Sequence, residues 1–181
     1  MRIGLVRHFK VTEQSGPNRM SGEQFNAWVT GYNHMGIESG EFSGSEEAWD
    51  ICISSDLPRA VMTAKQIYSG DILFNEQLRE IEIAAITQNR TKLHRNIWLA
   101  LGRIAWYIGH SSQPESRNHT LLRIKKVISD LERDFGSANV LVVTHGAFMK
   151  VLAQQLIRSG YNGERIVHPQ NGGLYIYERN I

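Results

Sequence analysis

The sequence predicts an α/β fold, a three-layer α/β/α sandwich around a mostly parallel central sheet. Short apolar runs alternate with amphipathic stretches along the 181 residues, which is the pattern of strands that alternate with helices. The runs are continuously apolar rather than alternating, so both faces of each strand should be covered. The predicted strands are residues 2–6, 50–54, 139–144 and 173–178, with a weaker candidate at residues 71–74. The run at 173–178 also fits an edge strand.

Helical patterns lie between these strands. Ser21 begins a capping box ahead of an amphipathic segment, residues 22–32. Pro58 suits the first turn of a second helix. Residues 119–135 place their apolar side chains largely along one face, and residues 146–158 directly follow a predicted strand as another helix.

Composition limits the classes of protein. The formal net charge of +2 suits a small anionic ligand but is too weak and dispersed for a nucleic-acid partner. The single cysteine, Cys52, cannot form an internal disulfide, which favours a reducing compartment. The N-terminal apolar run is too short for a signal peptide, and residues 97–109 are too short for a membrane span. We expect a cytoplasmic protein without a membrane partner; its oligomeric state is open.

Cationic and imidazole side chains follow three of the predicted strands. Arg7 and His8 end the first strand, Arg59 lies shortly after the second, and His145 follows residues 139–144. Ligands of open α/β sheets bind beyond the carboxyl ends of the strands. These four side chains should therefore meet in one cleft.

Arg59 is informative because it lies in the first turn of its predicted helix. A cation there faces the positive end of the helix dipole, at a cost of about 0.3–1 kcal/mol, unless a bound anion reverses the interaction. The alternative is a solvated surface charge. Guanidinium groups match phosphate, and a neutral imidazole is a competent nucleophile toward phosphorus. The residues therefore indicate a site in which Arg7 and Arg59 neutralise phosphate oxygens beside His8.

Four segments occur in the order VRH, SSDLPRAVMTA, LREI and VLVVTHG. They resemble the motifs of the histidine phosphatase superfamily, branch 1, which includes the cofactor-dependent phosphoglycerate mutases. The resemblance runs from Arg2 to Gly146, and Asn171-Gly172-Gly173 before the last strand is also similar. It implies a phosphoglycerate mutase-like fold.

The resemblance also implies a role for each site residue. His8 attacks the phosphoryl group and becomes a phosphohistidine. Arg7 and Arg59 bind the phosphate oxygens, and His145 donates a further hydrogen bond to the transferred group. Glu80 protonates the leaving oxygen and then acts as the base toward water. No cofactor and no metal are implied, and the remaining histidines lack metal-binding spacing.

Two departures from the family pattern concern this site. Phe9 stands where the family has glycine, so it either walls one side of the pocket or packs into the core. LREI continues as EIAAITQN instead of a glycine and a Trp-Glu-Gly run, which leaves a second candidate acid. Glu80 matches the motif, and Glu82, on the same side of an extended chain, is the alternative.

The whole chain, residues 1–181, is predicted to form one domain, because no repeat or long linker divides it. Residues 86–114 differ in composition, since the basic segment NRTKLHRN precedes the aromatic segment IWLALGRIAWYIG. We expect a helical insertion over the active-site end of the sheet. Its residues Trp98 and Trp106 either pack as part of a helix, contribute to a lid or take part in a dimer contact.

We therefore expect a metal-independent phosphatase that hydrolyses a small phosphate monoester through a phosphohistidine on His8. A phosphomutase is the weaker candidate, because the family mutases carry a C-terminal tail over the site and this sequence ends directly after its last predicted strand. The alternative is a weakly active or inactive relative that binds a phosphorylated ligand or a phosphoprotein. The expected partner is a small phosphorylated metabolite or a phosphoprotein, and the sequence does not identify it.

Overall fold

The computed structural model describes residues 1–12, 16–44 and 48–179. The chain divides into two compact units. The first is built from residues 1–12, 36–80 and 123–181, and the second from residues 13–35 and 81–122. The second unit is therefore larger than the insertion expected at 86–114, because it also contains the earlier segment 13–35.

Within the described residues, none of the helices is both long and apolar enough to span a membrane.

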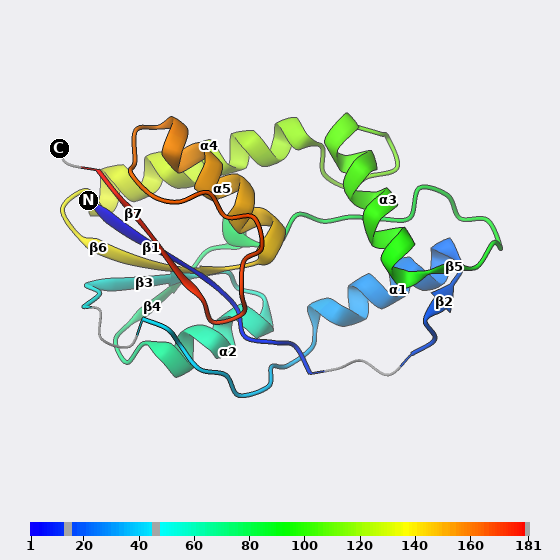
Figure 1. Ribbon diagram of the computed structural model, residues 1–181, viewed down its shortest axis with the longest axis horizontal. Coiled ribbons are helices and arrows are strands. Elements are labelled where there is room, and N and C mark those ends of the chain that lie inside the picture. Colours follow the sequence, from blue (N-terminus) through cyan, green and yellow to red (C-terminus); the bar gives the residue numbers. More distant parts are fainter. Residues whose placement is uncertain (13–15, 45–47, 180–181) are drawn as a thin grey trace. The chain divides into compact units, whose positions relative to one another are not determined.

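The first unit contains a five-stranded sheet in the order β4-β3-β6-β1-β7 (Figure 1). Its strands are β1 (Arg2–Arg7), β3 (Ile51–Ser54), β4 (Ile72–Phe74), β6 (Asn139–Thr144) and β7 (Leu174–Glu178). The neighbours β4, β3, β6 and β1 are parallel, whereas β7 pairs antiparallel with β1 at the edge. The mostly parallel sheet is confirmed, and the weaker strand candidate is also present as β4.

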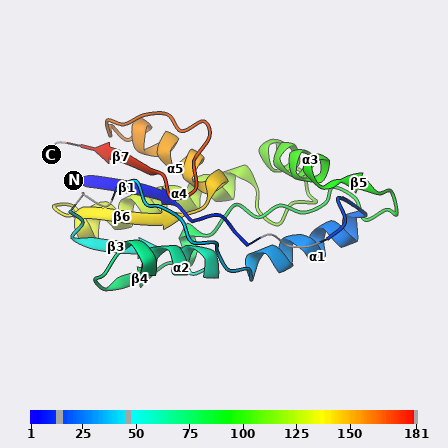
Figure 2. The same ribbon diagram turned by 60° about the horizontal axis from the view of Figure 1, so that its bottom comes forward.

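Helices cover both faces of this sheet. They are α2 (Pro58–Ile67), α5 (Gly146–Arg158) and the C-terminal part of α4 (Arg117–Phe135). On one face, Val6 and Leu141 form a buried cluster with Ala60 and Ala64 of α2. Helices α4 and α5 lie on the opposite face (Figures 1 and 2). The central strands β1 and β6 are buried on both sides, which explains their continuously apolar sequences.

The second unit contains two helices and a short antiparallel ribbon. Its elements are β2 (Arg19–Met20), α1 (Gly22–Asn33), β5 (Leu93–His94), α3 (Arg95–Ile108) and the first residues of α4. The capping box predicted at Ser21 is confirmed, because the Ser21 side chain accepts from the Gln24 N–H while the Gln24 side chain accepts from the Ser21 N–H.

Aromatic side chains form the core of this second unit. Trp98 is fully buried, and its ring stacks on that of Phe25 with 5.9 Å between centroids. The N–H groups of Trp98 and Trp106 are satisfied, because Trp98 Nε1 donates to Met20 O at 2.8 Å and Trp106 Nε1 donates to Thr120 Oγ1 at 3.0 Å. Trp98 and Trp106 therefore pack within their own unit.

Candidate active site

Three strands of the first unit end at the same edge of its sheet. Because β1, β6 and β3 are parallel and in register, their carboxyl ends are aligned. The ladder continues one residue further, since His8 N donates to Thr144 O at 3.0 Å and Ser55 N donates to Val143 O at 2.9 Å. The residues that follow the strands, His8, Ser55 and His145, are therefore neighbours.

The two imidazoles predicted to share a site lie side by side. The ring centroids of His8 and His145 are 5.1 Å apart, and both side chains are buried. His8 Nδ1 lies 2.6 Å from Phe9 O. A carbonyl oxygen only accepts, so Nδ1 carries the hydrogen and Nε2 of the neutral ring keeps its lone pair.

The electrostatic surroundings keep His8 uncharged at neutral pH. Burial, together with the cations Arg59 and Arg7, lowers the pKa of His8 from 6.5 to about 4. The hydrogen bond to Phe9 O and the negative charge of Glu80 raise this pKa but do not offset the burial. His8 is therefore a neutral imidazole with one unprotonated nitrogen.

Arg59 is a buried cation in the first turn of α2, with 1% of its surface exposed. Its Nε donates to His145 Nδ1 at 3.1 Å. One turn later, Thr63 Oγ1 donates to Arg59 O at 2.7 Å and accepts from Phe9 N at 2.9 Å. The solvated surface charge considered for Arg59 is wrong, because the side chain is enclosed beside both imidazoles.

Arg7 approaches the site from the end of β1. Its Nη1 donates to Pro169 O at 2.8 Å, whereas its buried Nε has no hydrogen-bond partner among the described residues. An added Cβ on Gly146 would lie 3.1 Å from this Nε. The absence of a side chain at Gly146 therefore leaves room for the Arg7 guanidinium. Buried donors are normally satisfied, and an anion would satisfy this one.

The segment before β7 fixes the main chain around His8. Asn171 Nδ2 donates to His8 O at 2.6 Å, and Gly172 N donates to Arg7 O at 2.9 Å. Gly172 has φ +72°, and an added Cβ would lie 2.5 Å from Glu41 O. This turn therefore requires glycine, and it ties the last part of the chain to the first strand.

Glu80 is held at the N-terminus of α5. Its carboxylate accepts from Ala147 N at 3.1 Å and from Phe148 N at 2.9 Å, the end of the helix where the dipole favours a negative charge. The negative charge of Glu80 raises the pKa of His8. Glu82 is exposed and belongs to the second unit. The choice between the two as the acid stays a prediction.

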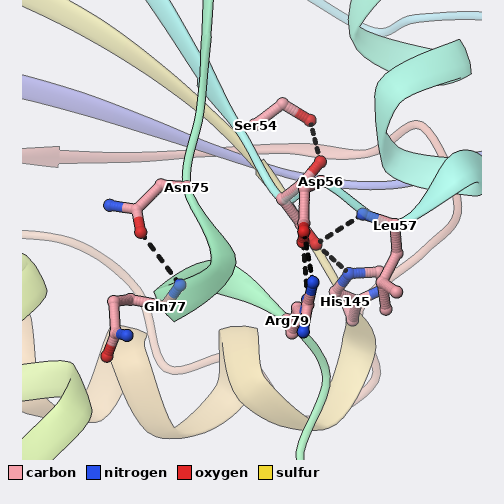
Figure 3. A network of polar contacts seen from close by, with 8 residues as sticks. Ser54, Asp56, Leu57, Asn75, Gln77, Arg79 and His145 are labelled. Carbon is pink, nitrogen blue, oxygen red and sulfur yellow. Dashed lines mark hydrogen bonds and ion pairs between the residues drawn. The ribbon is translucent and has the colours of Figure 1, made fainter.

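Two arginines hold the chain segment that precedes Glu80. Arg123 Nη1 donates to Gln77 O and to Arg79 O, both at 2.8 Å. Arg79 Nε donates to Asp56 Oδ1 at 2.7 Å, an ion pair that joins this segment to the loop after β3 (Figure 3). The guanidinium of Arg79 lowers the pKa of Asp56. The contacts position Glu80 relative to the strand ends.

Phe9 is 2% exposed, and its backbone needs no glycine. No described residue other than glycine has a positive φ. An added Cβ on Gly40 or on Gly172 would lie 2.6 or 2.7 Å from the Phe9 ring, so the ring packs directly against both residues. The Phe9 ring therefore packs into the core. Whether the ring also forms one wall of a pocket stays a prediction.

The structure brings five predicted site residues together in the first unit. They are Arg7, His8, Arg59, Glu80 and His145. Sequence reasoning missed the contact of Ser55 with His145 and the support that Thr63 gives to Arg59. The spacing of Arg59 and Thr63 by four residues signals the second contact, because a threonine in a helix can donate to the main-chain carbonyl four residues earlier. No sequence pattern signals the main-chain carbonyl of Pro169 as a partner of Arg7.

Comparisons with known proteins extend this description. A family model described as the histidine phosphatase superfamily (branch 1) matches residues 40–180. The comparison with curated proteins gave no match. A phosphoserine phosphatase from Entamoeba histolytica in complex with 3-phosphoglyceric acid is similar with a TM-score of 0.62 and 17% identity, over 97% of this chain and 89% of that chain.

Two further solved structures are similar at low identity. The alpha-ribazole phosphatase from Shigella flexneri has a TM-score of 0.52 and 19% identity, over 87% of this chain and 80% of that one. A mycobacterial glucosyl-3-phosphoglycerate phosphatase has a TM-score of 0.53 and 20% identity, over 87% and 79%. At these identities, the three structures support the fold.

The match to the family model includes three of the site residues and leaves out two. Arg59, Glu80 and His145 lie within residues 40–180, whereas Arg7 and His8 precede them, next to the unusual Phe9. The matched region is well over half of the chain and contains the motifs of the second arginine and the second histidine. The chain belongs to the histidine phosphatase superfamily, branch 1.

Proposed function

We propose that this protein is a metal-independent phosphatase that hydrolyses a small phosphate monoester through a phosphohistidine on His8. The observation that carries the proposal is the state of His8: a neutral imidazole whose Nδ1 hydrogen is held by Phe9 O, beside two arginines. Its Nε2 lone pair is available for attack, and the buried guanidinium of Arg59 attracts a phosphate dianion.

The reaction has two transfers. In the first, Glu80 takes up a proton from solvent as the substrate phosphate dianion binds beside its carboxylate. His8 Nε2 then forms a bond to phosphorus while the ester P–O bond breaks, and Glu80 gives this proton to the leaving oxygen. In the second, Glu80 takes a proton from water, the water oxygen bonds to phosphorus and the N–P bond breaks. Phosphate leaves, and His8 and Glu80 return to their starting states.

The arginines supply the positive charge that the transferred group requires. Arg59 and Arg7 bind its oxygens, and the unpartnered Nε of Arg7 gains an acceptor. In the free protein, His145 contacts Arg59 through Nδ1 and Ser55 through Nε2. Both ring nitrogens of His145 are therefore engaged in the free protein, and the hydrogen bond expected from His145 to the phosphoryl group stays a prediction.

Hydrolysis of an aryl phosphate in the presence of EDTA tests the proposal. We expect turnover that vanadate inhibits, and acid-labile radioactive phosphate on His8 after rapid denaturation. His8→Ala should lower kcat/KM by at least roughly 1000-fold and abolish labelling. His119→Ala, which changes an exposed histidine of the second unit, should leave both unchanged. Turnover in the His8 variant equal to that of the wild type would refute the mechanism.

The similar structures guide the choice of substrates. The three described above are a phosphoserine phosphatase, an alpha-ribazole phosphatase and a glucosyl-3-phosphoglycerate phosphatase. A panel of these phosphate esters, compared by kcat/KM, is the first screen for the substrate of this chain.

Binding without turnover is the second candidate function. Phe9 in place of the family glycine, and a family match that begins after His8, favour it. A protein that binds vanadate or phosphate tightly, releases no product and acquires no label would support a phospholigand-binding module. Measurable turnover that depends on His8 would exclude it.

A further inference from the structure

The side chain of Ser55 contacts His145 but has no part in the mechanism above. Ser55 directly follows β3 and is fully buried. Its Oγ lies 2.8 Å from His145 Nε2 and accepts from Leu57 N at 3.3 Å. Figure 3 shows Leu57 and His145 approaching the same oxygen from two sides.

The partners of His145 determine where its hydrogen lies. Arg59 Nε–H is always a donor, so His145 Nδ1, at 3.1 Å, must be the unprotonated nitrogen. Burial and the charge of Arg59 lower the pKa of His145 well below 6.5, so the ring is neutral and has one N–H. That N–H is on Nε2 and donates to Ser55 Oγ.

The opposite tautomer would place two hydrogens between His145 and Arg59. A hydrogen on Nδ1 would face the Arg59 Nε–H, and the contact that orients this guanidinium would be lost. Ser55 stabilises the required tautomer because its hydroxyl oxygen accepts from Nε2 where both side chains are fully buried. A buried N–H without this acceptor costs free energy, which removes the preference for the tautomer that holds Arg59.

We propose that Ser55 is a positioning residue, which fixes His145 in the Nε2–H tautomer so that Nδ1 orients Arg59 toward the phosphoryl group. Ser55 acts through His145 and Arg59 and does not touch the substrate. The inference rests on the proposed function and deepens it, because it assigns the orientation of the phosphate-binding arginine to a chain of three side chains.

Nitrogen-15 NMR of the histidine rings in the free protein tests the tautomer directly. In the wild type, His145 should show an unprotonated Nδ1 and a protonated Nε2. In Ser55→Ala, the His145 signals should no longer correspond to this one tautomer. Ser54→Ala is the matched control, because Ser54 is equally buried but donates its hydroxyl to the main-chain oxygen of Ser55.

A second pair of variants separates the hydroxyl from the shape of the side chain. Ser55→Thr and Ser55→Val have nearly the same volume, and only threonine keeps the acceptor oxygen. Threonine should restore the tautomer, whereas valine should not. Circular dichroism confirms that each variant is folded before it is compared.

Vanadate affinity and turnover provide the functional result. Ser55→Ala and Ser55→Val should weaken vanadate binding and lower kcat/KM by about 10-fold or more, and Ser54→Ala should change them by less than about 2-fold. An Nε2–H tautomer and wild-type vanadate affinity in Ser55→Ala would overturn the proposal. If the wild type shows no turnover, the proposed function fails, while the tautomer and vanadate results still decide the role of Ser55.

Discussion

The two units of this protein bury different kinds of side chains. In the second unit, the buried core contains the aromatic rings of Phe25, Trp98 and Trp106, and Thr120 is its single buried polar side chain among the described residues. In the first unit, buried polar side chains gather at the ends of three strands. They are His8, Ser54, Ser55, Arg59, Thr63, Thr144 and His145.

This difference shows which unit carries the chemistry. Burial of polar groups opposes folding unless each finds a hydrogen-bond partner, so such a cluster persists where it serves another purpose. Burial of aromatic rings stabilises the folded state directly. Substitutions of His8, Arg59 and His145 in this cluster should therefore affect activity most, and substitutions in the aromatic core should affect stability most.

The largest difference is expected between two neighbouring glutamates that belong to different units. Glu80→Gln should lower kcat by about 100-fold to 10,000-fold, because a general acid is lost. Glu82→Gln should change it by less than about 2-fold. The loss in Glu80→Gln should be greater for an alkyl phosphate than for an aryl phosphate, because an alkoxide is the poorer leaving group and needs the proton more.

Steady-state kinetics with both esters therefore tests the role of Glu80. Equal losses in kcat/KM, which reports the first transfer, with the alkyl and the aryl ester would show that Glu80 is not the acid. The same ester-dependent loss in the Glu82 variant would assign the acid to Glu82.

The aromatic core of the second unit should give the next largest effect. Trp98→Ala should lower the free energy of unfolding by about 3–5 kcal/mol, because it removes a fully buried indole and leaves a cavity. Ile104→Ala is the control on the same helix, since Ile104 is 59% exposed and should cost within about 0.5 kcal/mol. Urea unfolding followed by circular dichroism measures both. Equal losses in the two variants would contradict the assignment of this core.

The strands and the site were predictable to the extent that local sequence controls them. Continuous apolar runs predicted β1 and β6, because central strands of a parallel sheet are covered on both faces. The rule that ligands bind at the carboxyl ends of strands then grouped Arg7, His8, Arg59 and His145. The structure places all four in the first unit, with the rings of the two histidines 5.1 Å apart.

The remaining features depend on contacts between distant parts of the chain. The second unit combines residues 13–35 with 81–122 because Phe25 stacks on Trp98, a pairing of two helices that neither helix sequence reveals. Arg7 donates to Pro169 O and Arg123 donates to Gln77 O, and both acceptors are main-chain carbonyls, which any residue type offers. Such partners carry no compositional signal and require the tertiary structure.

The smallest expected effect is a pH dependence of stability that arises in the first unit. The pKa of His8 is about 4 in the folded protein and 6.5 when unperturbed, so between these values the unfolded chain binds a proton that the folded chain does not. The free energy of unfolding should therefore fall as the pH is lowered from about 6.5 to about 4, by about 3 kcal/mol. Above pH 6.5 neither state binds this proton, and below pH 4 both do. The lowered pKa of His145 acts in the same direction.

Removal of the imidazole isolates this contribution. His8→Asn should make the decline between pH 6.5 and 4 less steep and leave the part that His145 contributes. The lowered carboxylate pKa values, such as those of Asp130 and Asp134, act below their ordinary value of 3.8. Chemical denaturation at a series of pH values measures the slope for the wild type and the variant. Trp98→Ala should lower the curve without changing its slope, since it removes no titrating group. Parallel curves for the wild type and His8→Asn over this interval would show that folding does not lower the pKa of His8. The basis for a neutral His8 nucleophile would then be lost.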